Sequence, residues 1–256
     1  NVKEIRTVYL GDEAFRKTHH KVILSEEEKA VLRNLVVESM DKIDWIAILE
    51  LIGKYRRYLG DILLSESFFE ICLEEYLRQG SRKVFNHFLW NFRGIYFPLM
   101  YILSEEIPKA DLYHAVSTGY AGIMGSCASY VEKKPFLLSE HGIYTREREE
   151  DIIRSHWVEG DFKEIWINFF KKLSYIAYRQ AGRVTSLFGV SRSLQVELGC
   201  PAKKAVTIPN GVDVREYDGC RSKRKASSEE VTIGAVLRVV PIKDVKTMLL
   251  AFDIVK

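Results

Sequence analysis

The sequence has few of the features that mark nucleic-acid-binding or membrane-spanning proteins. Its 256 residues carry 38 Lys and Arg against 35 Asp and Glu, a formal net charge of +3. A nucleic-acid groove usually needs a clear cationic excess, so we expect no nucleic-acid partner. The best apolar run, Ile95 to Leu103, contains Pro98 and is too short for a transmembrane helix, which needs about 18 residues. No signal peptide is visible, so we expect a cytoplasmic location.

Cysteine and proline are also scarce. The four cysteines include no CxxC pair and have no histidine at zinc-finger spacing, so we expect reduced thiols and no metal ion. The sequence contains only 6 prolines, which argues against long Pro-rich linkers. Its hydrophobic content of 47% is typical of a folded protein, and its length allows two domains. Because there is no initiator Met and the apolar pattern at 247–255 has no stop signal, we expect an excerpt of a longer protein.

Hydrophobic periodicity predicts a helical segment followed by an α/β segment. After an apolar strand at 5–10, Ser25 to Glu28 form a capping box at a helix start. Further helices are expected at 44–58, 66–78 and 83–103. Beyond Pro108 the expected strands are 112–116, 136–138, 183–188 and 205–208, and the expected helices are 119–131, 144–155, 162–178 and 191–198. This alternation predicts a parallel sheet with helices on both faces.

The order of these elements suggests two domains. We expect residues 1–220 to form a Rossmann-like amino-terminal domain with a helical insertion at about 25–103. The charged, aperiodic stretch 221–230 is interpreted as a linker. Residues 231–256 would begin a second domain, with a strand at 231–236 and a helix from about Asp244.

The strongest candidate site follows the strand at 136–138. Glu140, His141 and Gly142 stand where that strand ends, and ligands bind at the carboxyl ends of strands in such sheets. An imidazole can donate or accept a hydrogen bond near neutral pH, and glycine permits close approach of a ligand. The alternative is that His141 caps a helix amide.

A second candidate follows the strand at 112–116, where Gly119, Tyr120 and Gly122 begin a glycine-rich helix. Small residues at this spacing allow a helix to pack closely on a sheet, and this structural role is enough to explain the glycines. The helix amino terminus could also hold an anion or sugar hydroxyls.

A third candidate is the loop that carries Arg238 and Lys243. Two cations before a helix amino terminus could converge on a diphosphate, although such side chains are more often solvated. Asn210 and Gly211 form a turn at the end of the strand 205–208, either at an interdomain crossover or in a tight turn.

In this order, the motifs resemble family 4 retaining glycosyltransferases of the GT-B fold. The resemblance rests on 208–213 and 238–244, and the segments 114–122 and 140–148 are similar to the PelF group. It implies a UDP-sugar donor, a growing extracellular polysaccharide as acceptor, no metal ion and contact with a membrane-bound polysaccharide assembly through partners. By the same resemblance, the amino domain lacks its first strand.

The resemblance also implies a role for each matching residue. Arg238 and Lys243 would hold the donor diphosphate and stabilise the departing nucleotide, and His141 with Gly142 would face the donor sugar. The set that we expect to bind substrate is completed by Glu140, Gly119, Tyr120 and Gly122, and Asn210 and Gly211 match the crossover near the hinge.

The sequence differs from the resembled family in two features, and two other functions are considered. The family's Gly-Gly-Val loop and its acidic pair find no match in the sequence, so we expect no transferase activity from this chain alone. The alternative function is a non-catalytic scaffold that docks through the helices at 25–103. An epimerase or dehydrogenase is disfavoured because no dinucleotide fingerprint is present.

Overall fold

The computed structural model describes residues 2–8, 20–80, 84–220 and 233–255. The chain divides into two compact units, Asn1–Asn210 and Gly211–Lys256. The first unit has an α/β fold with a Rossmann-like parallel sheet, as the alternation of strands and helices predicts.

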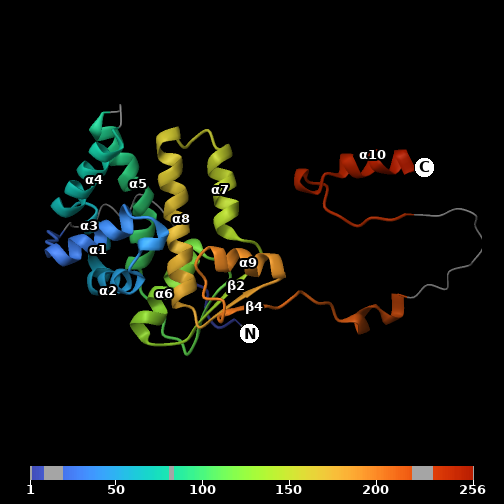
Figure 1. Cartoon of the computed structure of the whole chain (residues 1–256). Helices are drawn as coiled ribbons and strands as arrows, with labels where there is room; N and C mark the ends of the chain where they lie inside the picture. Colours follow the sequence, from blue (N-terminus) through green and yellow to red (C-terminus); the bar gives the residue numbers. More distant parts are fainter. Residues whose placement is uncertain (1, 9–19, 81–83, 221–232, 256) are drawn as a thin grey trace, which may run out of the picture. The chain divides into compact units, whose positions relative to one another are not determined.

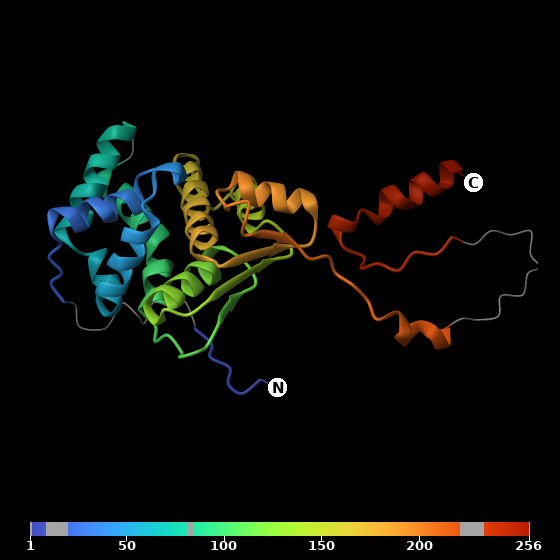
Figure 2. The same cartoon turned by 60° about the horizontal axis from the view of Figure 1, so that its bottom comes forward.

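The first half of this unit is helical. Its elements are α1 (Glu26–Val36), η2 (Met40–Lys42), α2 (Trp45–Tyr55), η3 (Arg56–Tyr58), α3 (Leu59–Ile62), α4 (Glu66–Gln79) and α5 (Phe85–Ser104). The predicted capping box is confirmed, because Ser25 accepts from the Glu28 amide while the Glu28 side chain accepts from the Ser25 amide. In both views these helices lie on the side of α8 (Gly160–Gln180) away from α9 (Gly189–Glu197) (Figures 1 and 2).

The second half supplies the sheet. Its strands are β1 (Tyr113–Ala115), β2 (Phe136–Glu140), β3 (Arg183–Ser186) and β4 (Ala205–Thr207), all parallel and in the order β1-β2-β3-β4. The connections contain α6 (Gly119–Glu132), α7 (Tyr144–Arg154), α8 and α9. The strands and helices predicted between 112 and 208 are therefore confirmed, with boundaries shifted by a few residues.

Helices on both faces of the sheet were expected, and this expectation is wrong for the described residues. Tyr178 on α8 and Gln195 on α9 both contact Glu140 on the buried face of β2, so both helices lie on that face. The opposite face carries His114, Leu137, Ser139, Arg183, Thr185 and Val206, which are partly or fully exposed. The physical reason is topological: right-handed crossovers between strands in sequential order place every connecting helix on one side.

Two predicted strands do not form in the described residues. Residues 5–8 and 233–236 have no regular structure, and the rest of each prediction, 9–10 and 231–232, lies outside the described part. A strand needs a neighbour to satisfy its backbone groups, and neither stretch has one there. The predicted linker 221–230 also lies outside it.

The second unit contains η4 (Val214–Cys220), η5 (Pro241–Lys243) and α10 (Val245–Val255). The predicted helix from about Asp244 is thus confirmed. Among the described residues of either unit, no helix has the length and apolar character needed to cross a membrane.

Candidate functional site

The loops that follow β1 and β2 touch at the carboxyl edge of the sheet. Thr118, which precedes α6, donates from its Oγ1 to Glu140 Oε1 at 3.1 Å. Gly119 has φ +67°, and a Cβ atom at this position would overlap the ring of Tyr144 at the start of α7. Two of the three predicted sites, one on each loop, are therefore adjacent in space. Glycine is required at 119 because both the backbone angle and the aromatic ring exclude a side chain.

Glu140 lies beneath these loops and not at their surface. Its side chain is 2% exposed, and its carboxylate also accepts from Tyr178 Oη at 2.7 Å and from Gln195 Nε2 at 3.0 Å. Burial raises the pKa of Glu140, while these hydrogen bonds act in the opposite direction. A carboxylate bound in this way joins β2 to α6, α8 and α9. The described contacts fit a positioning role for this predicted substrate-binding residue.

His141 and Gly142 are exposed, directly after the buried Glu140. Within the described part of the chain the His141 imidazole has no hydrogen-bond partner, and the N-cap of α7 is Ile143, with no side-chain cap. The helix-capping alternative for His141 is therefore wrong. A Cβ atom on Gly142 would collide with a Glu147 carboxylate oxygen, so the Glu147 side chain of α7 lies directly against this glycine.

Tyr120 and Gly122 lie against α8 and not at the carboxyl edge of the sheet. The Tyr120 ring lies 6.1 Å from the ring of Phe169 and 6.0 Å from that of Phe170, and burial raises its pKa. A Cβ atom on Gly122 would lie 3.0 Å from Ala177 Cβ on α8. These contacts agree with the close-packing interpretation of the glycine-rich helix.

In the second unit, Arg238 and Lys243 are both exposed and flank a tight turn. The Lys243 amide donates to the Val240 carbonyl at 2.9 Å, and Lys243 ends η5. Asp244 follows with φ +43° and accepts from the Thr247 amide at 3.3 Å, so it caps α10. Both cations therefore lie close in sequence to a formed helix amino terminus, where partial positive charge favours anions.

Asn210 and Gly211 stand where the two units divide, and both are exposed. Asn210 follows β4 in the first unit, and Gly211 begins the second. No cluster of three or more His, Cys, Asp or Glu suited to a metal ion occurs among the described residues.

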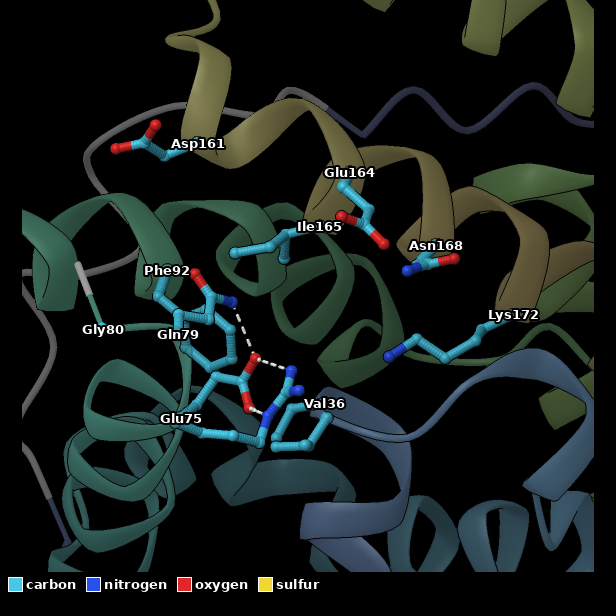
Figure 3. A pocket seen from close by; sticks show the side chains of 12 residues that line it. Val36, Glu75, Gln79, Gly80, Phe92, Asp161, Glu164, Ile165, Asn168 and Lys172 are labelled. Carbon is cyan, nitrogen blue, oxygen red and sulfur yellow. Dashed lines mark hydrogen bonds and ion pairs between the residues drawn. The ribbon is translucent and has the colours of Figure 1, made fainter.

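A polar pocket among the helices was not predicted from the sequence. It has a volume of about 550 Å³ and lies between α4, α5, α8 and the end of α1. Lys172 extends from α8 into it, toward Glu75 on α4 (Figure 3). Glu75 is 5% exposed and accepts from Arg78 Nε at 2.7 Å and from Gln79 Nε2 at 2.7 Å. A helical pattern in the sequence gives no signal for such a pocket, because its charged groups come from separate helices.

Lys172 is the most unusual group in this pocket. Its Nζ donates to the Leu35 carbonyl at 2.5 Å and to Tyr96 Oη at 3.4 Å. Burial lowers the pKa of Lys172 to about 7, although the carboxylates of Glu75 and Glu38 act to raise it. The amine is therefore only partly charged near neutral pH, and it ties α8 to the end of α1.

Comparison with known proteins gives one match. The model of a domain of unknown function, DUF3492, matches residues 1–203, which include the whole sheet apart from β4 and both loops at its carboxyl edge. No curated protein and no solved structure matches the chain. Because the match covers most of its length, the chain belongs to the DUF3492 domain family.

Proposed function

We propose that this chain is part of a retaining glycosyltransferase that transfers a sugar from a UDP donor to a growing extracellular polysaccharide. The DUF3492 domain occurs in glycosyltransferase-like proteins, which supports the assignment. The observation that carries it is the exposed His141–Gly142 pair at the carboxyl end of β2, where ligands bind in parallel α/β sheets. The GT-B and PelF-like assignments are part of this proposal.

In this function the second unit supplies positive charge. Arg238 and Lys243 neutralise the two phosphates of the donor, and the amino terminus of α10 adds its partial charge. When the bond between sugar and diphosphate breaks, charge develops on the leaving UDP. Fixed cations stabilise this charge more than they stabilise the bound donor, which lowers the barrier.

In the first unit, the two touching loops after β1 and β2 bind the substrate in this function. His141 contacts a hydroxyl group of the donor sugar, and Gly142 lets that sugar approach the backbone. Glu140 acts through the loops and does not touch the substrate, because its carboxylate is already bound by Thr118, Tyr178 and Gln195. No residue of the described part is assigned as a nucleophile.

Transfer from a panel of labelled UDP-sugars by the full-length protein tests the proposal. We expect incorporation into polymer from at least one of them and a loss of about a hundredfold in kcat for His141→Ala, with little change in the affinity for UDP. His156→Ala, at another exposed histidine, is the matched control and should retain activity. The absence of transfer from every UDP-sugar would contradict the proposal.

One observation favours a second candidate, a non-catalytic scaffold. Phe69, Leu73 and Leu77 form a stripe on α4 whose side chains are 36% to 67% exposed. Apolar side chains at this spacing are typical of a face that binds a partner helix. Binding of a membrane-assembly protein through this stripe, together with no binding of UDP, would support the scaffold over the transferase.

A further inference from the structure

A groove in the helical half of the first unit is lined by three of the four tryptophans of the chain. It has a volume of about 310 Å³ and lies between α5, the connection from α7 to α8, and the first turns of α8. The residues that line it include Trp90, Asn91, Gly94, Trp157, Glu159 and Trp166. This volume is at the small end of the range of about 300–1,000 Å³ that is usual for ligand pockets.

Two of these indoles are exposed and yet held in place. The side chains of Trp90 and Trp157 are 60% and 72% exposed. The Arg93 guanidinium lies over the Trp90 ring at 5.1 Å, and the Trp157 ring meets Trp166 edge-on at 6.0 Å. Each exposed indole is therefore anchored by a neighbour on its own side of the groove. Pre-oriented aromatic surfaces lose little entropy when a ligand stacks on them.

Polar groups lie between the tryptophans. Glu159 Oε1 is 3.0 Å from His87 Nε2, and Asn91 donates from its side chain to the His87 carbonyl at 2.9 Å. These contacts orient a carboxylate and an amide at the wall of the groove. Carboxylates accept and amides both donate and accept, so together they can pair with hydroxyl groups.

Gly94 keeps the groove open. It lies one turn after Trp90 on α5, and a Cβ atom at this position would have nothing within 4 Å. A glycine inside a helix costs about 1 kcal/mol relative to alanine. Nothing packs against the helix at Gly94, so close packing does not explain why glycine stands here. The free space beside Gly94 is part of the groove.

We infer that this groove binds a neutral glycan chain, with sugar rings stacked on Trp90 and Trp157. A sugar ring has a face of C–H groups, which the electron-rich face of an indole attracts, and a rim of hydroxyl groups, which suit Glu159 and Asn91. Anionic ligands fit less well, because Glu159 places a carboxylate at the wall of the groove. The same carboxylate opposes docking on an anionic membrane surface.

The use of the groove rests on the proposed function, whereas glycan binding itself does not. In a polysaccharide-elongating enzyme, a second glycan site would retain the growing chain between transfers. Such retention raises the effective concentration of the acceptor end and favours repeated addition over release.

Titration of the full-length protein with neutral oligosaccharides of glucose, galactose and N-acetylhexosamine tests the inference without UDP. We expect saturable binding to at least one of them by calorimetry. Trp90→Ala and Trp157→Ala should each weaken it about tenfold, the loss of one stacking contact. Gly94→Leu should abolish it by filling the groove while leaving the melting temperature unchanged or higher. Trp45→Phe, on α2, is the matched control and should bind normally.

Three results would overturn the inference. They are no binding of any oligosaccharide, binding that Gly94→Leu leaves intact, and binding of anionic phosphatidylglycerol vesicles that depends on Trp90 and Trp157 in place of glycan binding. UDP affinity measured on the same samples separates the two proposals. Intact UDP binding without glycan binding removes only the glycan groove, and glycan binding without UDP binding removes only the transferase.

Discussion

Removal of the buried carboxylate of Glu140 should destabilise the edge of the sheet that carries the candidate site. Glu140→Ala removes the carboxylate that accepts from three buried side chains, namely Thr118, Tyr178 and Gln195. An unpaired buried donor costs about 1–3 kcal/mol, and the losses in one network are not additive. We expect a loss of about 3–5 kcal/mol in the free energy of unfolding. Glu140→Gln keeps one oxygen and should lose about 1–2 kcal/mol.

The pH dependence separates the effect of the charge from that of the packing. Burial raises the pKa of Glu140 above its ordinary value of 4.5, so the folded state keeps the proton to a higher pH than the unfolded chain. The associated stability is complete below about pH 4.5 and is lost as pH rises through the folded pKa. The difference between the wild type and Glu140→Gln should therefore be larger at about pH 5 than at about pH 8.

Urea denaturation followed by circular dichroism at both pH values measures these differences. Glu197→Gln, an exposed position on α9, is the control and should change stability by less than about 0.5 kcal/mol. A Glu140→Ala variant as stable as the wild type would refute the positioning role. A difference between wild type and Glu140→Gln that grows with pH would refute the assigned direction of the pKa.

Three further perturbations follow from the packing. Gly119→Ala should lose about 1–3 kcal/mol in thermal unfolding because of its positive φ and the overlap with Tyr144, whereas Gly60→Ala, with open space around it, should not be destabilised. Burial lowers the pKa of Lys172 to about 7, so the stability that this group contributes is lost as pH falls through that value. The wild type should therefore become more stable to denaturant as pH rises from about 7 toward 10. Lys172→Met should not show this gain. Three buried thiols should react with a disulfide reagent only after unfolding, since burial raises the pKa of Cys72 to about 12 and those of Cys127 and Cys200 to about 11.

Much of the fold could be predicted from local patterns in the sequence. The capping box at Ser25, the aromatic stripe of α5 and the short apolar strands around Leu138 each express a local preference that survives in the structure. Which segments pair with one another as strands could not be predicted. The stretches 5–8 and 233–236 have the composition of strands, but a strand depends on a neighbour that local composition does not reveal.

The candidate site was predicted in part. His141 was identified because it directly follows β2, and the end of a strand can be predicted from the apolar pattern of the sequence. The structure shows this histidine exposed. Side-chain direction could not be read in the same way. Glu140 and Tyr120 point into the interior because α8 and α9 supply their partners from more than 35 residues away in the sequence. The tryptophan groove was missed for the same reason, because α5 and α8 contribute its two walls.

Calorimetric titration of UDP into the full-length protein is the sharpest test of a donor site at Arg238 and Lys243. We expect saturable binding that weakens at least about tenfold in Arg238→Ala and in Lys243→Ala, since each removes one charge-assisted contact to phosphate. Lys203→Ala, which removes an exposed lysine before β4, should leave the affinity unchanged. UDP binding of equal strength in all four proteins, or no binding in any of them, would contradict this donor site.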